Sequence, residues 1–258
     1  PRRSMNSLLI DVEVPPISQL TRWGAGPLGF NKTAAVYVFA ALATMLLLYL
    51  GTREKRLVPA GFFQNTAESS IDFVKNQIVL QTMGADGIRF LPYLATLFFF
   101  IFFSNITEVI PGIQFPANSK FGVPAVLALL TWLIYNVVGI VKQGPLHYLK
   151  NSTIPPGVPW LILPLVAVIE FAQLIIVRPF SLAVRLFANM LAGHLILVTF
   201  GVLCAALWAA KPTLVILPFT FFLLVAMTGF EILVSFLQAF IFTILAAVYI
   251  GSSMHPEH

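Results

Sequence analysis

Long apolar stretches dominate the order of hydrophobic and polar positions along this chain. Three of them lie near 33–50, 90–110 and 121–142. A helix needs about 20 apolar residues to cross roughly 30 Å of hydrocarbon. We therefore predict three membrane-spanning helices that stand roughly perpendicular to the bilayer, within an all-α integral membrane protein.

Residues 61–82 follow a different pattern, in which apolar residues recur at spacings of four and three with polar residues between them. The apolar positions are Phe63, Ala67, Ile71, Val74 and Ile78. This spacing predicts an amphipathic helix with one apolar face and one wet face. We expect it to lie on the membrane rather than cross it. Packing against a partner fits the pattern equally well.

Two C-terminal stretches, 156–209 and 212–254, are too long for one perpendicular crossing each. If fully helical, they would extend about 80 Å and about 64 Å. Each is therefore either two spans or one long, strongly tilted helix. Pro179 is placed to kink the first stretch, and the sequence Lys211–Pro212 is the expected turn between the two.

The composition excludes a soluble or a disordered protein. Only 10% of the 258 residues are charged and 59% are hydrophobic, whereas a soluble domain carries roughly 25% charged residues. The lone cysteine, Cys204, excludes an intrachain disulfide. We interpret 31–258 as a single membrane domain and 1–30 as an extracytoplasmic tail. Met5 is a candidate native start, with residues 1–4 an annotation remnant before it.

Basic residues predict the orientation of the helices. They follow the first and third predicted spans, at Arg53, Lys55, Arg56, Lys142 and Lys150, together with His147. The connection 111–120 holds only Lys120. Because cytoplasmic loops carry an excess of Lys and Arg, the ends of the first and third spans should face the cytoplasm. The N-terminus is then outside, and two single long C-terminal helices would leave the C-terminus inside.

Charged residues at membrane depth are costly and mark functional candidates. Arg178, Ser181, Arg185 and Asn189 fall within about 80° of one another on a helical wheel. Because arginine keeps its proton in proteins, Arg185 cannot carry protons. It can pair transiently with a mobile carboxylate and repel a passing proton. The alternative is a fixed buried salt bridge with an acidic residue, Glu170 or Glu231. Arg178 either joins the stripe or snorkels to the interface.

A second polar stripe lies on the last helix, where Glu231, Ser235, Gln238 and Tyr249 fall within about 60° of one another. Glu231 can carry a proton, and it either forms a titrating pair with His194 or is satisfied locally. At the external end of the second span, Ser104, Asn105 and Glu108 form a polar entrance, or Glu108 is an ordinary interfacial carboxylate. Asn105 and Glu108, three residues apart, share one helix face.

Three segments resemble subunit a of the F-type ATP synthase. They are RPFSLAVRLFANMLAGHLIL (178–197), FEILVSFLQAFIFTILAAVYI (230–250) and FFSNITEVIP (102–111). The first is similar to the family's pattern around its essential arginine, R-L-x-x-N-x-x-A-G, and the second to its Q-A-F-I-F element. The resemblance covers roughly 33–254.

This resemblance implies roles for the polar residues. Arg185 matches the arginine that faces the carboxylates of a rotor ring. Asn105, Glu108, Asn189, His194, Glu231 and Gln238 would form an outer half-channel, and Glu170 and Ser181 an inner one. His194 and Glu231 occupy positions that are Glu and His in some members, so the pair is exchanged here. Glu170 lies nine residues before Pro179, where many members have eight.

The resemblance also implies partners and a location. Two long tilted helices would form a hairpin against the c-ring, with subunit b of the peripheral stalk and the remaining synthase subunits alongside. The expected membrane is the bacterial plasma membrane or, alternatively, the mitochondrial inner membrane. We expect a non-catalytic subunit, because the phosphate-binding motif G-x-x-x-x-G-K-[ST] is absent. We expect no cofactor, no metal and no nucleic acid, and protons rather than sodium as the ion.

Two rival functions remain open at this level. A proton-coupled secondary transporter would use Glu231 and His194 as a relay, but such proteins carry repeats or broken helices, and neither is evident here. A purely structural membrane protein would not need a buried arginine with polar stripes on two helices. Copurification with a ring of small proteolipids distinguishes the synthase function from both.

Overall fold

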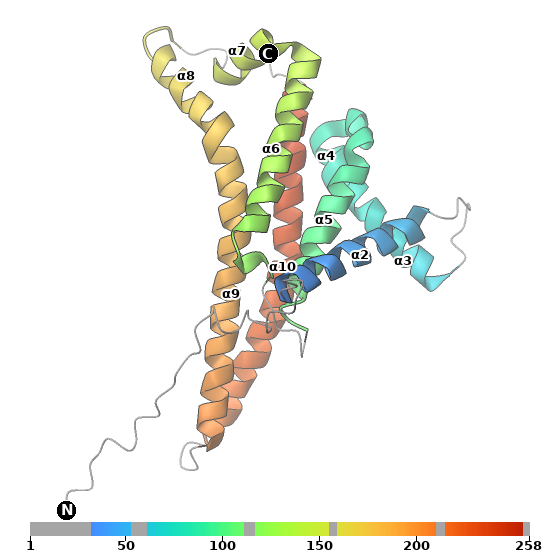
Figure 1. The fold of residues 1–258 in the computed structure, drawn as a ribbon, viewed down its shortest axis with the longest axis vertical. Helices are drawn as coiled ribbons and strands as arrows, with labels where there is room; N and C mark the ends of the chain where they lie inside the picture. Colours follow the sequence, from blue (N-terminus) through green and yellow to red (C-terminus); the bar gives the residue numbers. More distant parts are fainter. Residues whose placement is uncertain (1–31, 53–60, 111–116, 155–158, 210–214, 255–258) are drawn as a thin grey trace, which may run out of the picture.

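The computed structural model describes residues 32–52, 61–110, 117–154, 159–209 and 215–254, and in these ranges the fold consists of helices joined by short turns (Figure 1). Five helical stretches in them are long and apolar enough to cross a membrane. The predicted tail 1–30, the turn at Lys211–Pro212 and the basic cluster at 53–56 lie outside the described residues.

The three predicted spans are helices. They are α2 (Lys32–Thr52), α5 (Leu91–Ile106) and α6 (Gly122–Gln143). Helices α5 and α6 run along α10 (Leu217–Met254), whereas α2 crosses this direction and packs on α5 (Figure 1). The three spans therefore differ in direction, and not all of them can stand perpendicular to one bilayer.

Each C-terminal stretch is one long helix rather than two spans. The first consists of α8 (Leu163–Ala172), a π-helical turn (Gln173–Val177) and α9 (Arg178–Ala209). It begins at Leu163, later than the predicted 156, with Pro164 in its first turn, where proline is well tolerated. The second is α10. The helix continues through Pro179, because the preceding π turn accommodates a residue that has no N–H to donate.

Helices α9 and α10 lie side by side over their outer halves and diverge towards α8 (Figure 1). Helix α6 packs against both α9 and α10. Helix α7 (Pro145–Thr153) closes this end, where the Tyr148 ring lies against Gly139 and the Tyr148 hydroxyl donates to Asn136 Oδ1 at 3.1 Å. The Gln143 side-chain amide donates to the Ser253 carbonyl at 2.8 Å and so ties α6 to the end of α10.

The predicted amphipathic helix is present as α3 (Phe62–Val74), a π turn (Lys75–Val79) and α4 (Leu80–Met83). Its apolar face packs within this chain, against α2, α5 and α10. Ala67, Val74 and Ile78 are buried, whereas Phe63 at the outer end is 76% exposed. Of the two alternatives, packing against a partner therefore describes most of this face, and the partner is other helices of the same chain.

A sharp reversal joins this helix to α5. Gly84 has a φ of +64° in the left-handed region that favours glycine. A 3₁₀ segment, Gly84–Phe90, follows and leads into α5. Behind it, Arg89 extends its guanidinium to the Met254 sulfur at 2.9 Å, at the end of α10. The reversal places the polar end of α5 at the middle of the long helices, where the candidate site lies.

Candidate functional site

Three ionisable side chains from three helices converge in the interior. Glu108 follows the C-terminal end of α5, His194 lies on α9 and Glu231 lies on α10. They are 2%, 6% and 4% exposed. His194 Nδ1 lies 3.3 Å from Glu108 Oε1, close enough for an ion pair when the imidazole is protonated. Glu108 is therefore not an ordinary interfacial carboxylate.

Glu231 reaches this cluster because residue 193 is glycine. A Cβ built on Gly193 would lie less than 3.0 Å from both oxygens and the carboxyl carbon of Glu231. The Glu231 carboxyl group thus packs directly on the backbone of α9, one residue before His194. It is also within electrostatic range of Glu108. The contact of His194 is with Glu108, so the structure joins His194 and Glu231 through a three-member cluster rather than as a pair.

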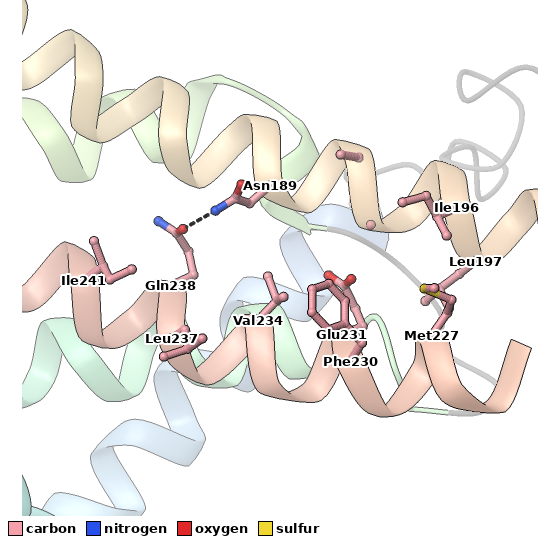
Figure 2. Close-up of a pocket in the computed structure, with 12 residues that line it drawn as sticks. Asn189, Ile196, Leu197, Met227, Phe230, Glu231, Val234, Leu237, Gln238 and Ile241 are labelled. Atoms are coloured by element: carbon pink, nitrogen blue, oxygen red, sulfur yellow. Dashed lines mark hydrogen bonds between the residues drawn. The ribbon is translucent and has the colours of Figure 1, made fainter. Parts of the chain in front are cut away.

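A second polar pair lies one turn or more further along the same two helices. Asn189 donates from Nδ2 to Gln238 Oε1 at 2.5 Å, which bridges α9 and α10 (Figure 2). Gln238 and Ser235 are buried, at 2% and 1% exposed. With Glu231 they confirm the predicted polar stripe on α10, which faces the interior.

A groove of about 300 Å³ extends between α9 and α10, from Glu231 to the Asn189–Gln238 pair. Asn189, Glu231 and Gln238 contribute its polar lining, and apolar residues such as Val234 and Ile196 form the rest (Figure 2). Two side chains that line this groove have a buried polar atom without a protein hydrogen bond, namely Glu231 Oε1 and Gln238 Nε2. Such groups in proteins normally bind water, so the groove suits a hydrated path.

The outer end of the site contains a polar network that sequence reasoning missed in part. Asn118 donates to Ser104 Oγ at 2.9 Å and to Asn105 Oδ1 at 2.6 Å. The Tyr37 hydroxyl lies 2.8 Å from the carbonyl of Ala117 and 3.0 Å from Asn118 Oδ1. Ser104 and Asn105 were predicted, but Asn118 belongs to a short connection that looks solvated, and Tyr37 lies in an apolar run.

Arg185 occupies a different face of α9. It is half-buried and forms no salt bridge with the described acidic residues. The alternative of a fixed salt bridge with Glu170 or Glu231 is therefore wrong. Asn189 on the same stripe is exposed. Arg178 stacks its guanidinium 5.2 Å from the centre of the Tyr249 ring, an attractive cation–π geometry. Two members of the stripe, Arg178 and Asn189, thus contact α10, while Arg185 between them is half-buried and pairs with no described acidic residue.

Glu170 lies far from the buried cluster. It is half-buried on α8, and the 24 positions that separate it from His194 correspond to about 36 Å of helix. Between Glu170 and Arg185 the helix contains the π turn Gln173–Val177. Ser181 is also half-buried, and it precedes Arg185 along the helix, as Glu170 does. The predicted inner residues and the predicted outer cluster are thus on opposite sides of Arg185.

Comparison with known proteins shows the family of this chain. The family model for the ATP synthase A chain matches residues 34–251. The chain belongs to the ATP synthase subunit a family. A subunit a of Frankia alni is 43% identical over 237 residues, covering 91% of this chain and 81% of the relative. That of Nitrobacter winogradskyi is 40% identical over 248 residues, covering 95% and 96%, and that of Rhodococcus erythropolis is 37% identical over 244.

Membership of this family makes the chain a membrane subunit of a proton-translocating ATP synthase. The resemblance seen in the motifs is thereby confirmed. The buried Glu108–His194–Glu231 cluster, the Asn189–Gln238 bridge and the half-buried Arg185 are then features of a subunit a, and their geometry bears on how it handles protons.

Proposed function

We propose that this subunit a conducts protons through two half-channels that Arg185 separates. The observation that carries the proposal is the burial of Glu108, His194 and Glu231, with His194 on a different face of α9 from Arg185, which pairs with no described acidic residue. Two titratable carboxyls and an imidazole buried near one another can pass a proton along, whereas arginine cannot.

The outer half-channel begins at the polar network of Asn105 and Asn118 and continues through the Glu108–His194 pair to Glu231. From Glu231 the groove leads along the stripe to Gln238 and its bridge with Asn189. Asn118 contacts Asn105, His194 contacts Glu108, and Glu231, Gln238 and Asn189 share the groove. Glu231 is within electrostatic range of Glu108. This path would deliver a proton from outside to the surface of α9, where a partner carboxylate receives it.

Arg185 acts as the stator charge on that surface. It would attract the ionised carboxylate of a small helical subunit in the c-ring and lower that group's pKa, which promotes proton release. A protonated carboxyl group can enter lipid, because the costly charge has been removed. The fixed charge of Arg185 also opposes direct passage of a proton between the half-channels. The released proton would leave through the inner half-channel near Glu170 and Ser181.

The remaining parts of the complex follow from this mechanism. The subunit itself performs no ATP chemistry, and the hairpin of α9 and α10 would follow the curved c-ring with subunit b and lipid around the other helices. We place it in the bacterial plasma membrane, with the N-terminus outside and the C-terminus in the cytoplasm. A proton crossing 100 mV releases about 2.3 kcal/mol, so several protons in each turn suffice to drive synthesis.

The test is ATP-driven acidification of inverted vesicles that contain the complex with Arg185→Ala. We expect coupled pumping to be lost while the c-ring still copurifies with the subunit. Lys142→Ala removes an exposed cation from the end of α6 and is the matched control. Near-normal pumping by the assembled Arg185→Ala complex would overturn the assignment. A secondary transporter, the rival function, would show no copurifying ring at all.

A further inference from the structure

The helix between Glu170 and Arg185 holds one residue more than a regular helix needs. The hydrogen bond that defines the turn runs from the Arg178 N–H to the Gln173 carbonyl, five residues earlier. A π turn holds one more residue than the α turn that it replaces. The π turn therefore changes the rotational position of every residue on α8 relative to those on α9, by about 100°.

This rotation decides which face of the helix Glu170 joins. With Arg178 at 0°, Arg185 falls at about −20° and Asn189 at about +20°. In a regular α-helix Glu170 would fall at about −80°, away from them. With one residue absorbed by the π turn, Glu170 moves to about +20°. The turn thus brings Glu170 into line with both arginines and Asn189. It also offsets the one-residue excess between Glu170 and Pro179.

The π turn leaves one carbonyl without a backbone donor. The N–H of Arg178 bonds to Gln173, and the next N–H along the chain does not exist, because residue 179 is proline. The Leu174 carbonyl is bonded instead by two side chains of α6. Trp132 Nε1–H donates to it at 3.0 Å, and the Tyr135 hydroxyl donates at 2.9 Å.

We propose that Trp132 and Tyr135 are positioning residues for proton release. They hold the π turn at Gln173–Val177 by bonding the Leu174 carbonyl, and the π turn keeps Glu170 on the face of Arg178 and Arg185. This inference rests on the inner half-channel proposed above and deepens it. Trp132 and Tyr135 are three residues apart on α6, so one face of that helix supplies both donors.

The first test changes the number of residues in the turn. Deleting Ile176 lets the same Arg178–Gln173 hydrogen bond form as an ordinary α-helical bond, and Glu170 keeps its orientation. We expect this deletion to retain coupled proton pumping. Inserting one alanine after Ile176 adds a further rotation of about 100° and should abolish pumping. If the deletion abolishes pumping as the insertion does, while both complexes assemble, the proposal is wrong.

The second test reads the orientation directly, without relying on pumping. Single cysteines replace Glu170 or Phe171 in a Cys204→Ser chain, and a membrane-impermeant maleimide is added from the cytoplasmic side. Without the π turn, Phe171 would take the orientation of Glu170. We expect labelling at position 170 and little at 171 when Trp132 and Tyr135 are present.

In the Trp132→Phe/Tyr135→Phe variant an aromatic ring remains at both positions but both donors are lost. Two hydrogen bonds of ordinary net strength together change an equilibrium by about thirtyfold, so the labelling preference should move towards 171. An unchanged preference for 170 would overturn the role of the two donors. Equal labelling at positions 170 and 171 in the parent chain would contradict the proposed orientation of Glu170 but not the inner half-channel. No labelling at either position would contradict both.

Discussion

Gly193→Ala tests the packing of the Glu231 carboxyl group on α9. The added Cβ would lie less than 3.0 Å from three carboxyl atoms of Glu231, whereas ordinary van der Waals contact begins at 3.4 Å. Glu231 is 4% exposed, so its carboxyl group must retreat by about 1 Å within a packed interior. A misplacement of about 1 Å in a reacting group costs up to about 10²-fold in rate. We expect ATP-driven proton pumping to fall by that order.

Two further variants separate this effect from a loss of helix stability. Gly201→Ala lies on the same helix and its Cβ would meet no atom within 4 Å. Both glycine-to-alanine changes gain about 1 kcal/mol of helix propensity, so only the contact with Glu231 differs between them. Gly201→Ala should pump normally. Adding Glu231→Asp to Gly193→Ala shortens the acid by about 1.5 Å and should restore part of the activity.

The assay is acidification of inverted vesicles, normalised to the amount of assembled complex. Normal pumping by Gly193→Ala, with the c-ring present in normal amounts, would refute the claim that Glu231 carries protons from its position on Gly193. Equal losses in the Gly193→Ala and Gly201→Ala complexes would refute the claim that the carboxyl contact is the cause.

Two other predictions follow from the same structure. His194→Leu removes the partner that lies 3.3 Å from Glu108 and leaves a buried carboxyl group without it. Pumping should fall by about 10²-fold or more, the order expected for losing one proton-transfer group; assembly at parental levels with normal pumping would contradict this. Gly139→Ala places a Cβ less than 3.0 Å from the Tyr148 ring, which costs about 1–3 kcal/mol of stability. The detergent-solubilised complex should dissociate at a lower temperature, whereas Gly122→Ala, with no atom within 4 Å, should leave it unchanged.

Much of the fold was predictable because a membrane requires every backbone N–H and C=O that crosses it to be hydrogen-bonded within the protein. Apolar runs of sufficient length must be helices, since an unsatisfied backbone is too costly in lipid. Helices α2, α5 and α6 therefore lie close to the predicted ranges. The direction of each helix was not predictable, because it depends on packing between neighbouring helices. The crossing of α2 over α5 carries no local sequence signal.

The amphipathic helix shows the same limit. Its period indicated one apolar face, but whether lipid or protein covers that face depends on residues far away in the chain. Val74 and Ile78 are fully buried against other helices of this chain, so protein rather than lipid covers this part of the face. A spacing rule cannot identify a partner, since it describes only one of the two surfaces.

For the candidate site, the sequence alone determined which polar residues lie at membrane depth and which share a helix face. Charge in an apolar run is conspicuous, so Arg185, His194 and Glu231 could be identified from their neighbours. Tertiary structure alone decided the partners. Glu108 meets His194, and Glu231 rests on Gly193, because contacts between helices depend on their depth and rotation. Those are set by side-chain packing and, in α8, by a single residue absorbed in a π turn.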